Sequence, residues 1–354
     1  MGKYEKRHPW SLKKKLLVAL CVVLSIILAM LIAITIFVGD KFDRLNRVPG
    51  TGETYAQTDV PDETDQVDPD FTGPTMDGSD VTWGEDPTET VGGEHIINIL
   101  LVGQDAREGQ GRQRSDAMIL CTFNTGTNTL TMTSFLRDTY VQIPGYSDNR
   151  LNVPYVLGGF QLLDETLELN FGVHVDANVE VNFAGFAHIV DAMGGVNIEL
   201  TSAEANYLNK RGNWDVPGQY NWKLTKGMNK LTGEQALAYS RIRYLDSDFG
   251  RTNRQRKVLT ALINQCRDMN LLELNKLVDT VLPYVTTDMT NAQITGYMME
   301  LFPMLSSVQI NTQHIPADNA YTLTMIRGMS VLLPDLEKNR QILFESLMGG
   351  HTTP

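Results

Sequence analysis

The sequence predicts a three-layer α/β domain, with a central mixed β-sheet between helices, tethered to one N-terminal transmembrane helix. Three observations predict this class: an uncharged run near the N-terminus, an acidic segment after it, and short apolar runs alternating with amphipathic helices beyond His95. A length of 354 residues and a hydrophobic content of 42% exclude a wholly disordered chain. We expect four segments: a basic tail over residues 1–15, the transmembrane helix over 16–38, a flexible acidic linker over 39–94, and the folded α/β domain over 95–350.

The first organisational feature is Leu16 to Val38, which contains no charged residue. At 1.5 Å per residue, a helix of this length spans about 35 Å, enough to cross a hydrocarbon core of about 30 Å. Lysines and an arginine precede it, so residues 1–15 are expected in the cytoplasm and the rest of the chain outside the cell membrane. A cleaved signal peptide is the alternative, but its apolar core is usually shorter, which favours an uncleaved single-pass anchor.

Charge is unevenly distributed along the chain. The sequence has 30 Lys and Arg against 42 Asp and Glu, a formal net charge of −12. Residues 48–94 contain no Lys or Arg and are rich in Gly, Pro, Thr, Asp and Glu, which predicts a flexible acidic linker over 39–94. Nucleic-acid-binding proteins usually have the opposite balance, so no nucleic-acid partner is expected.

The folded α/β domain is expected over residues 95–350. Ile96 to Val102 predicts a buried strand, and Ala117–Phe123 with Thr129–Phe135 predicts a hairpin. Further strands are expected at Asn178–Val181 and Val196–Leu200, and helices at Gln161–Leu169, Phe183–Met193, Gly233–Arg241 and Thr252–Met269. The three cysteines fit no zinc or disulfide framework and leave a Cys121–Cys266 bridge open.

Charged side chains follow the first three strands of this domain. Asp105 comes directly after the first strand, Arg114 and Asp116 open the second, and Arg137 and Asp138 follow the third. If these strands are neighbours, the two carboxylates Asp105 and Asp116 converge with arginines beside them. Carboxylates are ligands for magnesium, and guanidinium groups bind phosphate oxygens. Solvated charge at strand ends is the alternative interpretation.

A denser cluster of charge lies between residues 239 and 256. It contains Arg241, Arg243, Asp246, Asp248, Arg251, Arg254, Gln255 and Arg256. Arg241 and Arg243, two residues apart, point the same way only in an extended segment. Arg251, Arg254 and Gln255 would share the N-terminal end of a helix that starts near Phe249. The cluster therefore predicts an anion site with donors for two phosphates, and a surface salt-bridge network is the alternative.

Six motifs along the chain resemble the LytR-CpsA-Psr family. They are Asn98-Ile-Leu-Leu-Val-Gly-Gln-Asp, Arg114-Ser-Asp-Ala-Met, Arg137-Asp-Thr-Tyr-Val, Val190-Asp-Ala-Met-Gly-Gly-Val, Leu231-Thr-Gly-Glu-Gln-Ala-Leu-Ala-Tyr and Arg241-Ile-Arg with Asp248-Phe-Gly-Arg and Arg254-Gln255. They occur in the family's order over about residues 95–270. The resemblance implies a mixed sheet between helices, with an apolar pocket for a lipid tail.

The resemblance also implies an activity, a magnesium-dependent phosphotransferase of the cell envelope. Such enzymes move an anionic glycopolymer, of teichoic acid or capsule type, from a polyprenyl diphosphate carrier to N-acetylmuramic acid of peptidoglycan, forming a phosphodiester. Carried over to this chain, the magnesium ligands are Asp105 and Asp116, and the diphosphate ligands are Arg114, Arg137, Arg241, Arg243, Arg251 and Gln255. The supporting residues are Asp138, Asn152, Asp248 and Arg254.

Within that set, the catalytic residues implied are Asp105, Arg114, Asp116, Arg137, Arg241 and Arg243. Asp105 and Asp138 are the candidates for the general base. Two other functions stay open: hydrolysis of the diphosphate with water as acceptor, and binding of lipid-linked precursors without turnover. Candidates for the apolar pocket are Phe160, Leu163, Leu167, Phe183, Phe186, Ile189, Val190, Leu259 and Ile263, although such stripes more often form a core.

Overall fold

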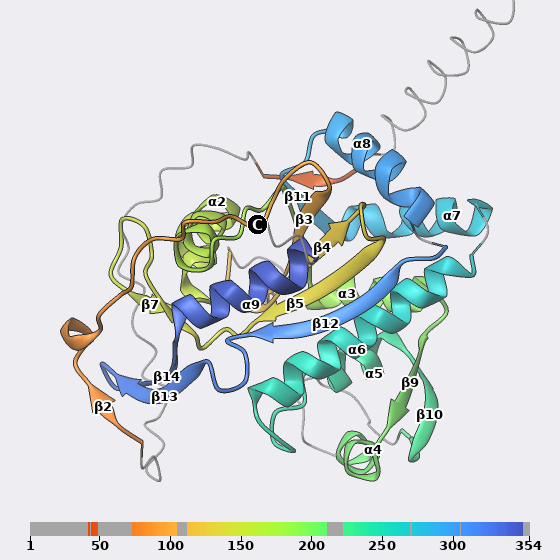
Figure 1. Ribbon diagram of the computed structural model, residues 1–354. Helices are drawn as coiled ribbons and strands as arrows, with labels where there is room; N and C mark the ends of the chain where they lie inside the picture. Colours follow the sequence, from red (N-terminus) through yellow and green to blue (C-terminus); the bar gives the residue numbers. More distant parts are fainter. Residues whose placement is uncertain are drawn as a thin grey trace, which may run out of the picture. The chain divides into compact units, whose positions relative to one another are not determined.

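Figure 1 shows the computed structural model of the chain, which describes residues 42, 44–48, 73–104, 112–210, 222–269, 271–304 and 306–349. The chain divides into two compact units, Met1–Leu45 and Asn46–Pro354, and every element named below belongs to the second. The expected transmembrane segment, 16–38, lies outside the described residues. Within those residues, no helix has both the length and the apolar character that a membrane crossing requires.

Among the described residues, a seven-stranded mixed sheet forms the middle layer. In spatial order its strands are β1 (Asn46–Arg47), β11 (Val285–Thr287), β8 (Ala177–Asn182), β3 (Ile96–Gln104), β4 (Ser115–Asn124), β5 (Thr129–Phe135) and β12 (Gln309–Ile315). The strands β3, β4 and β5 pair antiparallel, whereas β8 runs parallel to β3 and β12 runs parallel to β5. The expected mixed sheet, with its central hairpin, is confirmed.

Side chains alternate between the two faces of this sheet and give it two apolar surfaces. One face packs against α2 (Val153–Phe171) and α9 (Leu336–Met348) through residues such as Leu120, which is fully buried. The other face packs against α6 (Asp248–Arg267) through residues such as Ile119. Helices therefore cover both faces, and the three layers can be followed in Figure 1.

A second apolar core lies beside α6. Its elements are α3 (Phe183–Ala192), β9 (Val196–Leu200), α4 (Ser202–Asn209), β10 (Gly227–Leu231) and α5 (Gly233–Ser240). The strands β9 and β10 form their own antiparallel ladder. The other elements are β2 (Thr75–Met76), η1 (Gly78–Asp80), β6 (Tyr140–Val141), β7 (Asn149–Arg150), α7 (Leu271–Val281), η2 (Leu282–Tyr284), α8 (Asn291–Leu301), η3 (Phe302–Met304), β13 (Tyr321–Ile326) and β14 (Met329–Pro334).

Each strand and helix expected between residues 96 and 269 has a counterpart, but the helix expected to start at Gln161 begins earlier. The helix α2 starts at Val153, with Pro154 in its first turn, where the missing N–H of proline costs nothing. Gly159 interrupts it with φ 65° and ψ −150°, a conformation that glycine adopts readily. The expected start at Gln161 therefore corresponds to the second part of a kinked helix.

Residues 73–94, which we expected to belong to a flexible linker, are ordered against the domain. The strand β2 pairs with β13, and the indole Nε1 of Trp83 donates a hydrogen bond of 2.7 Å to Asp148. Val91 is buried and forms a bridge with Val173. A few apolar side chains are enough to fix this segment, although its average composition is that of a tether. Residues 49–72 of the expected linker lie outside the described residues.

The disulfide that the sequence left open does not form. Cys121 and Cys266 are both free, and Cys121 is buried in the face of the sheet covered by α6. Burial in this apolar surrounding raises the pKa of the Cys121 thiol to about 12. Cys121 therefore acts as a small apolar residue of the core.

The contact between α3 and α5 yields a stability prediction. A Cβ on Gly233, the first residue of α5, would lie 2.0 Å from the backbone oxygen of Ala187 in α3. We expect Gly233→Ala to lower the free energy of unfolding by about 1–3 kcal/mol, because the two helices must separate. Chemical denaturation measures this change. Gly84→Ala, where the Cβ meets nothing within 4 Å, is the control, and equal stability of both variants would contradict the prediction.

Candidate active site

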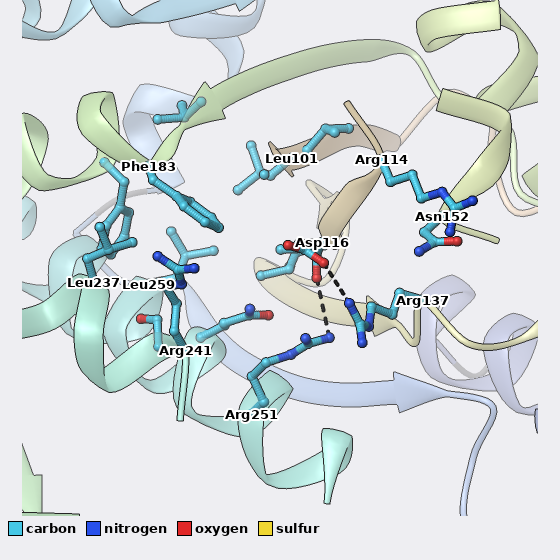
Figure 2. Close-up of a pocket in the computed structure, with 18 of the residues that line it drawn as sticks. Leu101, Arg114, Asp116, Arg137, Asn152, Phe183, Leu237, Arg241, Arg251 and Leu259 are labelled. Carbon is cyan, nitrogen blue, oxygen red and sulfur yellow. Dashed lines mark hydrogen bonds and ion pairs between the residues drawn. The ribbon is translucent and has the colours of Figure 1, made fainter. Parts of the chain in front are cut away.

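A cavity of about 840 Å³ lies between the sheet and the helices α3, α5 and α6. Its floor comes from β3, β4 and β8, and its lining has two characters. Figure 2 shows Phe183, Leu237 and Leu259 at one end, Leu101 and Asp116 in the middle, and Arg114, Asn152 and Arg137 toward the other end. One cavity therefore joins an apolar compartment to a cationic one.

Asp116 owes its position to a β-bulge in β4. Gly103 pairs with Ala117 and the next residue, Gln104, pairs with Ser115, so the register skips Asp116. An extra residue of this kind bends the strand and changes the direction of its side chain. The Asp116 carboxylate lines the cavity, where Oδ1 accepts a hydrogen bond of 2.8 Å from Nη1 of Arg137.

Arg137 lies in the segment that follows β5. Backbone hydrogen bonds fix this segment: Leu136 donates to the oxygen of Ile315, and Asn152 donates to the oxygen of Arg137. Nε of Arg137 lies 3.6 Å from Asp138, which also lies 3.8 Å from Nε of Arg150. Asp138, one of the two candidates for the general base, is therefore held between two arginines, and it is not among the residues that line the cavity.

Arg241 and Arg243 enter the cavity from the end of α5. Between them, Ile242 is fully buried in the second core, so its two neighbours project together from a non-helical segment. The Arg241 guanidinium lies over the ring of Phe183, 4.6 Å from its centroid, and Nη2 of Arg243 lies 3.6 Å from the Asp116 carboxylate. Both arginines line the cavity, as expected, but the predicted extended segment is wrong: Arg241 has φ −102° and ψ 0°, in the helical region, so a turn after α5 brings the two side chains together.

The first turns of α6 supply Arg251 and Gln255, four residues apart on the face toward the cavity. Arg251 is 3% exposed, and its Nη2 lies 2.6 Å from the Asp248 carboxylate and 3.5 Å from the backbone oxygen of Asp116. The side-chain oxygen of Gln255 is buried and has no hydrogen-bond partner among the residues that the structure describes. A polar ligand in the cavity would satisfy this oxygen.

The close packing of these arginines shifts their pKa values. Burial, together with the nearby cations Arg137 and Arg243, lowers the pKa of Arg251 to about 10 against the opposite effect of Asp248 and Asp116. Burial also lowers the pKa of Arg137, but Asp138, Asp116 and Asp248 outweigh it and raise that pKa. Burial raises the pKa of Asp248 despite its contact with Arg251. The site is therefore a desolvated cationic surface that an anion would stabilise.

The end of β3 leads to Asp105, and a polar network fixes this end. The side-chain amide of Gln104 and the hydroxyl of Tyr155 both donate to the Glu180 carboxylate, and the Gln104 oxygen accepts from the backbone N–H of Gln113 at 2.8 Å. Asp105 itself lies outside the described residues, so its expected convergence with Asp116 stays a prediction. Arg114 and Asn152, in contrast, both line the cavity.

Arg254, expected beside the diphosphate site, points away from the cavity. Its Nε donates to Glu204 at 2.9 Å, and its two terminal nitrogens donate to Asp246 at 3.0 and 2.5 Å. It is 4% exposed, and a third contact links Nη1 to the backbone oxygen of Ile242 at 3.1 Å. Arg254 therefore fixes the segment that carries Arg241, instead of sharing the helix end with Arg251 and Gln255.

The apolar end of the cavity contains part of the expected set. Phe183, Phe186, Ile189 and Leu259 line it, together with residues that the sequence did not single out, Leu101, Val179, Val181, Leu237 and Leu262. The other candidates belong to cores: Phe160, Leu163 and Leu167 under α9, Val190 in the second core, and Ile263 against the sheet. Helical spacing alone did not distinguish the two groups.

Comparison with known proteins gives the family of the chain. The LytR_cpsA_psr family model matches residues 73–345, which is most of the chain and includes every described strand from β2 to β14. The chain belongs to the LytR-CpsA-Psr family. The match also begins at the ordered segment before His95, in agreement with the packing of Trp83 and Val91.

Two relatives within this family carry transferase names. The polyisoprenyl-teichoic acid–peptidoglycan teichoic acid transferase TagT of Bacillus subtilis is 34% identical over 222 residues, covering 61% of this chain and 66% of the relative. The transferase TagU of Halalkalibacterium halodurans is 31% identical over 281 residues, covering 78% of this chain and 81% of the relative. The chain thus spans about two thirds of the first relative and more of the second.

A solved structure of the LytR-CpsA-Psr family holds a lipid. The family protein YwtF (TagT) with bound octaprenyl pyrophosphate is 27% identical, has a TM-score of 0.52, and aligns with 72% of this chain and 92% of its own. The mixed α/β fold with a central mixed sheet is therefore common to this chain and the solved structures of the family.

Several functional contacts had no signal in the sequence. Phe183 was named for its apolar character, but its place beneath the guanidinium of Arg241 depends on how α3 packs on α5. Glu204 completes a capping box with Thr201, a pattern visible as Thr-x-x-Glu, but the same carboxylate also binds Arg254. The bulge at Asp116 was not expected either, because register is a property of two strands.

The pairing of Glu204 with Arg254 predicts a pH-dependent stability. Burial raises the pKa of Glu204, but hydrogen bonds from Thr201 and Arg254 outweigh it, and the pKa is lowered. A lowered pKa contributes stability above the unfolded value, and this contribution is lost as the pH falls through the folded value. We expect Glu204→Gln to cost about 1–3 kcal/mol at pH 7, with the difference from the unchanged chain narrowing below pH 4.

Chemical denaturation at pH 7 and at about pH 3.5 tests this linkage, since the second value lies below the ordinary range of a glutamate. Glu199→Gln is the matched control, because Glu199 is exposed on β9. A Glu204→Gln difference that stays constant across this range would show that charge at Glu204 does not contribute to stability.

Proposed function

We propose that the chain is a phosphotransferase that moves an anionic glycopolymer from a polyprenyl diphosphate carrier to N-acetylmuramic acid of peptidoglycan, forming a phosphodiester. The observation that carries this proposal is the single cavity of about 840 Å³ in which five arginines adjoin an apolar compartment. A polyprenyl diphosphate has the same two parts, a charged head and an apolar tail. The names of the relatives and the lipid held by one family structure support this substrate class.

The arrangement divides the work between the arginines. Arg137, Arg243 and Arg251 surround Asp116 and present donors toward the same space, and Arg241 enters it from the apolar side, over Phe183. Guanidinium groups bind phosphate oxygens through two parallel hydrogen bonds, and they stay charged at physiological pH. They would hold the diphosphate and stabilise the charge that develops on it as the bond to the carrier breaks.

In the proposed reaction, the acceptor hydroxyl attacks the phosphorus attached to the sugar of the donor. A new P–O bond forms, the bond from that phosphorus to the bridging oxygen breaks, and polyprenyl phosphate leaves with the electron pair. The hydroxyl proton passes to a base, for which Asp105 is the stronger candidate because Asp138 is held between Arg137 and Arg150. The protein contributes mainly position and charge, as phosphoryl transfer requires.

We further propose that magnesium binds at Asp116 and Asp105. Within the described residues, no group of three or more His, Cys, Asp or Glu side chains could hold a metal ion by itself. Magnesium commonly takes one or two carboxylates and completes its shell with water and substrate phosphates, so a carboxylate on the cavity wall beside the diphosphate donors fits it. Bound there, the ion would neutralise charge on the diphosphate.

The apolar segment 16–38 completes the proposal. As a single-pass anchor with a cytoplasmic N-terminus, it would place the domain on the outer side of the cell membrane. A carrier lipid in the same membrane and peptidoglycan outside it would then both be within reach. Mutual repulsion among the acidic residues of 49–72 would extend the linker that joins segment 16–38 to the domain.

Arg241→Ala tests the transferase proposal. The full-length chain in mild detergent is incubated with a synthetic polyprenyl-diphosphate oligosaccharide, magnesium and peptidoglycan fragments, and the products are identified by mass spectrometry. We expect the unchanged chain to join glycan to fragment through one phosphate, and Arg241→Ala to lower kcat/KM by about 10²- to 10³-fold. Arg327→Ala, a change outside the cavity, should transfer normally.

The products also separate the alternatives for this site. Release of polyprenyl phosphate without joined product, with acceptor present, would assign a hydrolase. Tight binding of the donor without turnover would assign a binding protein. A folded Arg241→Ala variant that transfers at the normal rate would remove the diphosphate assignment altogether.

Asp116→Asn tests the proposed metal site. The amide keeps the shape of the side chain but removes the negative charge, so we expect the magnesium concentration for half-maximal activity to rise about tenfold or more. Steady-state rates across a magnesium titration measure this shift, and the exposed Asp268→Asn is the control. If activity falls while the magnesium requirement stays the same, Asp116 acts only by positioning Arg137 and Arg243.

A further inference from the structure

A second cavity, of about 820 Å³, lies on the opposite side of α6 from the candidate active site. We name it the α6–β9 groove. Its lining comes from α6, from β9 with the turn after it, from Lys226 before β10, and from Thr312 of β12. The helix and the β9–β10 ladder lie side by side in Figure 1. Residues of α6 therefore contribute to two cavities, one on each side of the helix.

The groove contains a buried arginine that forms no ion pair with another described residue. Arg256 lines the groove and is only 6% exposed, and its buried Nε and Nη1 atoms have no hydrogen-bond partner in the described part of the chain. Burial lowers the pKa of Arg256 to about 10, and no carboxylate opposes that effect. An uncompensated buried charge is costly, so such an arrangement requires a compensating group from outside the described residues.

The other groups on the groove wall have a consistent chemistry. Lys257 and Lys226 add two positive charges, and Glu199 is the one carboxylate among the lining residues. The neutral lining is rich in hydroxyl and amide groups, contributed by Asn197, Thr201, Ser202, Asn253, Thr260, Asn264 and Thr312. Cations bind an acidic group, whereas hydroxyl and amide side chains exchange hydrogen bonds with sugar or polyol hydroxyls.

Arg254, the neighbour of Arg256 two positions earlier, shows how this chain treats a structural arginine. Its guanidinium reaches two carboxylates and a backbone oxygen, all within 3.1 Å. Arg256 lies on the same helix and is equally buried, but within the described part of the chain it has no such partners. Burial alone therefore does not explain why Arg256 lacks the partners that Arg254 has.

We propose that the α6–β9 groove binds a phosphate-bearing polyol or saccharide chain, with a phosphate paired to Arg256. This inference rests on the proposed function only for the source of the ligand. If the chain binds a donor glycopolymer with its diphosphate near Arg251, the polymer could continue past Asn253 toward Arg256. A free anionic glycan of the envelope has the same chemistry, and the two sources are separated below.

The first experiment measures binding alone. Isothermal titration of the full-length chain in mild detergent uses a free glycerol-phosphate hexamer as the probe, with a neutral oligosaccharide of similar length for comparison. We expect the hexamer to bind, and Arg256→Gln to weaken it about tenfold or more, as for other charge-assisted phosphate contacts. Lys257→Gln, a change at an exposed residue of the groove, should also bind the hexamer more weakly than the unchanged chain. This variant replaces Arg256→Gln in the test if Arg256→Gln does not fold.

Two controls locate the probe. Lys276→Gln removes a positive charge on α7, outside the groove, and should not change binding. Arg241→Ala alters the active site and reports hexamer that binds there, so binding in the groove must persist in this variant. Unchanged affinity in both Arg256→Gln and Lys257→Gln, or a loss of hexamer binding in Arg241→Ala alone, would overturn the proposal.

The second experiment identifies the source. KM is measured for lipid-linked donors that carry one, three or six glycerol-phosphate units. If the groove holds the donor polymer, KM falls with polymer length in the unchanged chain and not in Arg256→Gln, while kcat stays similar. If KM is independent of length in both, with free hexamer binding retained, the groove takes a free glycan. Absence of transfer by every variant would refute the proposed function and leave the binding result standing.

Discussion

The contacts of Asp116 with the surrounding arginines are the interaction on which the candidate site depends. Arg137 and Arg243 both approach the same carboxylate oxygen, and Arg251 reaches the backbone oxygen of the same residue. Guanidinium groups this close repel each other, and repulsion from Arg137 and Arg243 adds to burial, which is the main cause of the lowered pKa of Arg251. The Asp116 carboxylate at the centre of the group, with Asp138 and Asp248 beside it, lets cations from three separate elements converge on one cavity.

The sequence was informative where the signal is local. The apolar runs predicted β3, β4 and β5. Arg241 and Arg243, two residues apart, both reach the cavity because Ile242 between them is buried. Arg251 and Gln255 share a helical face because they are four residues apart. The order of motifs also gave the family, which the matched model confirms. These features depend on residues that are neighbours along the chain.

Features that depend on contacts between distant segments were not predictable. Arg254 lies in the same cluster as Arg251, yet besides the nearby Asp246 it binds Glu204, fifty residues away in sequence. Residues 73–94 have the composition of a linker, but Trp83 donates a hydrogen bond to Asp148 and Val91 forms a β-bridge with Val173. The sequence predicted no elements after Met269, although β12 extends the central sheet and α9 covers one face of it.

The bulge in β4 separates the fold of this domain from its chemistry. The skipped residue has no partner in β3, so the ladder on either side is in register without it. Loss of the single codon for Asp116 would restore an uninterrupted strand and keep every inward-facing apolar residue of β4 on its present side. An in-frame deletion of three nucleotides would therefore remove the carboxylate around which the arginines gather, with little cost to the core.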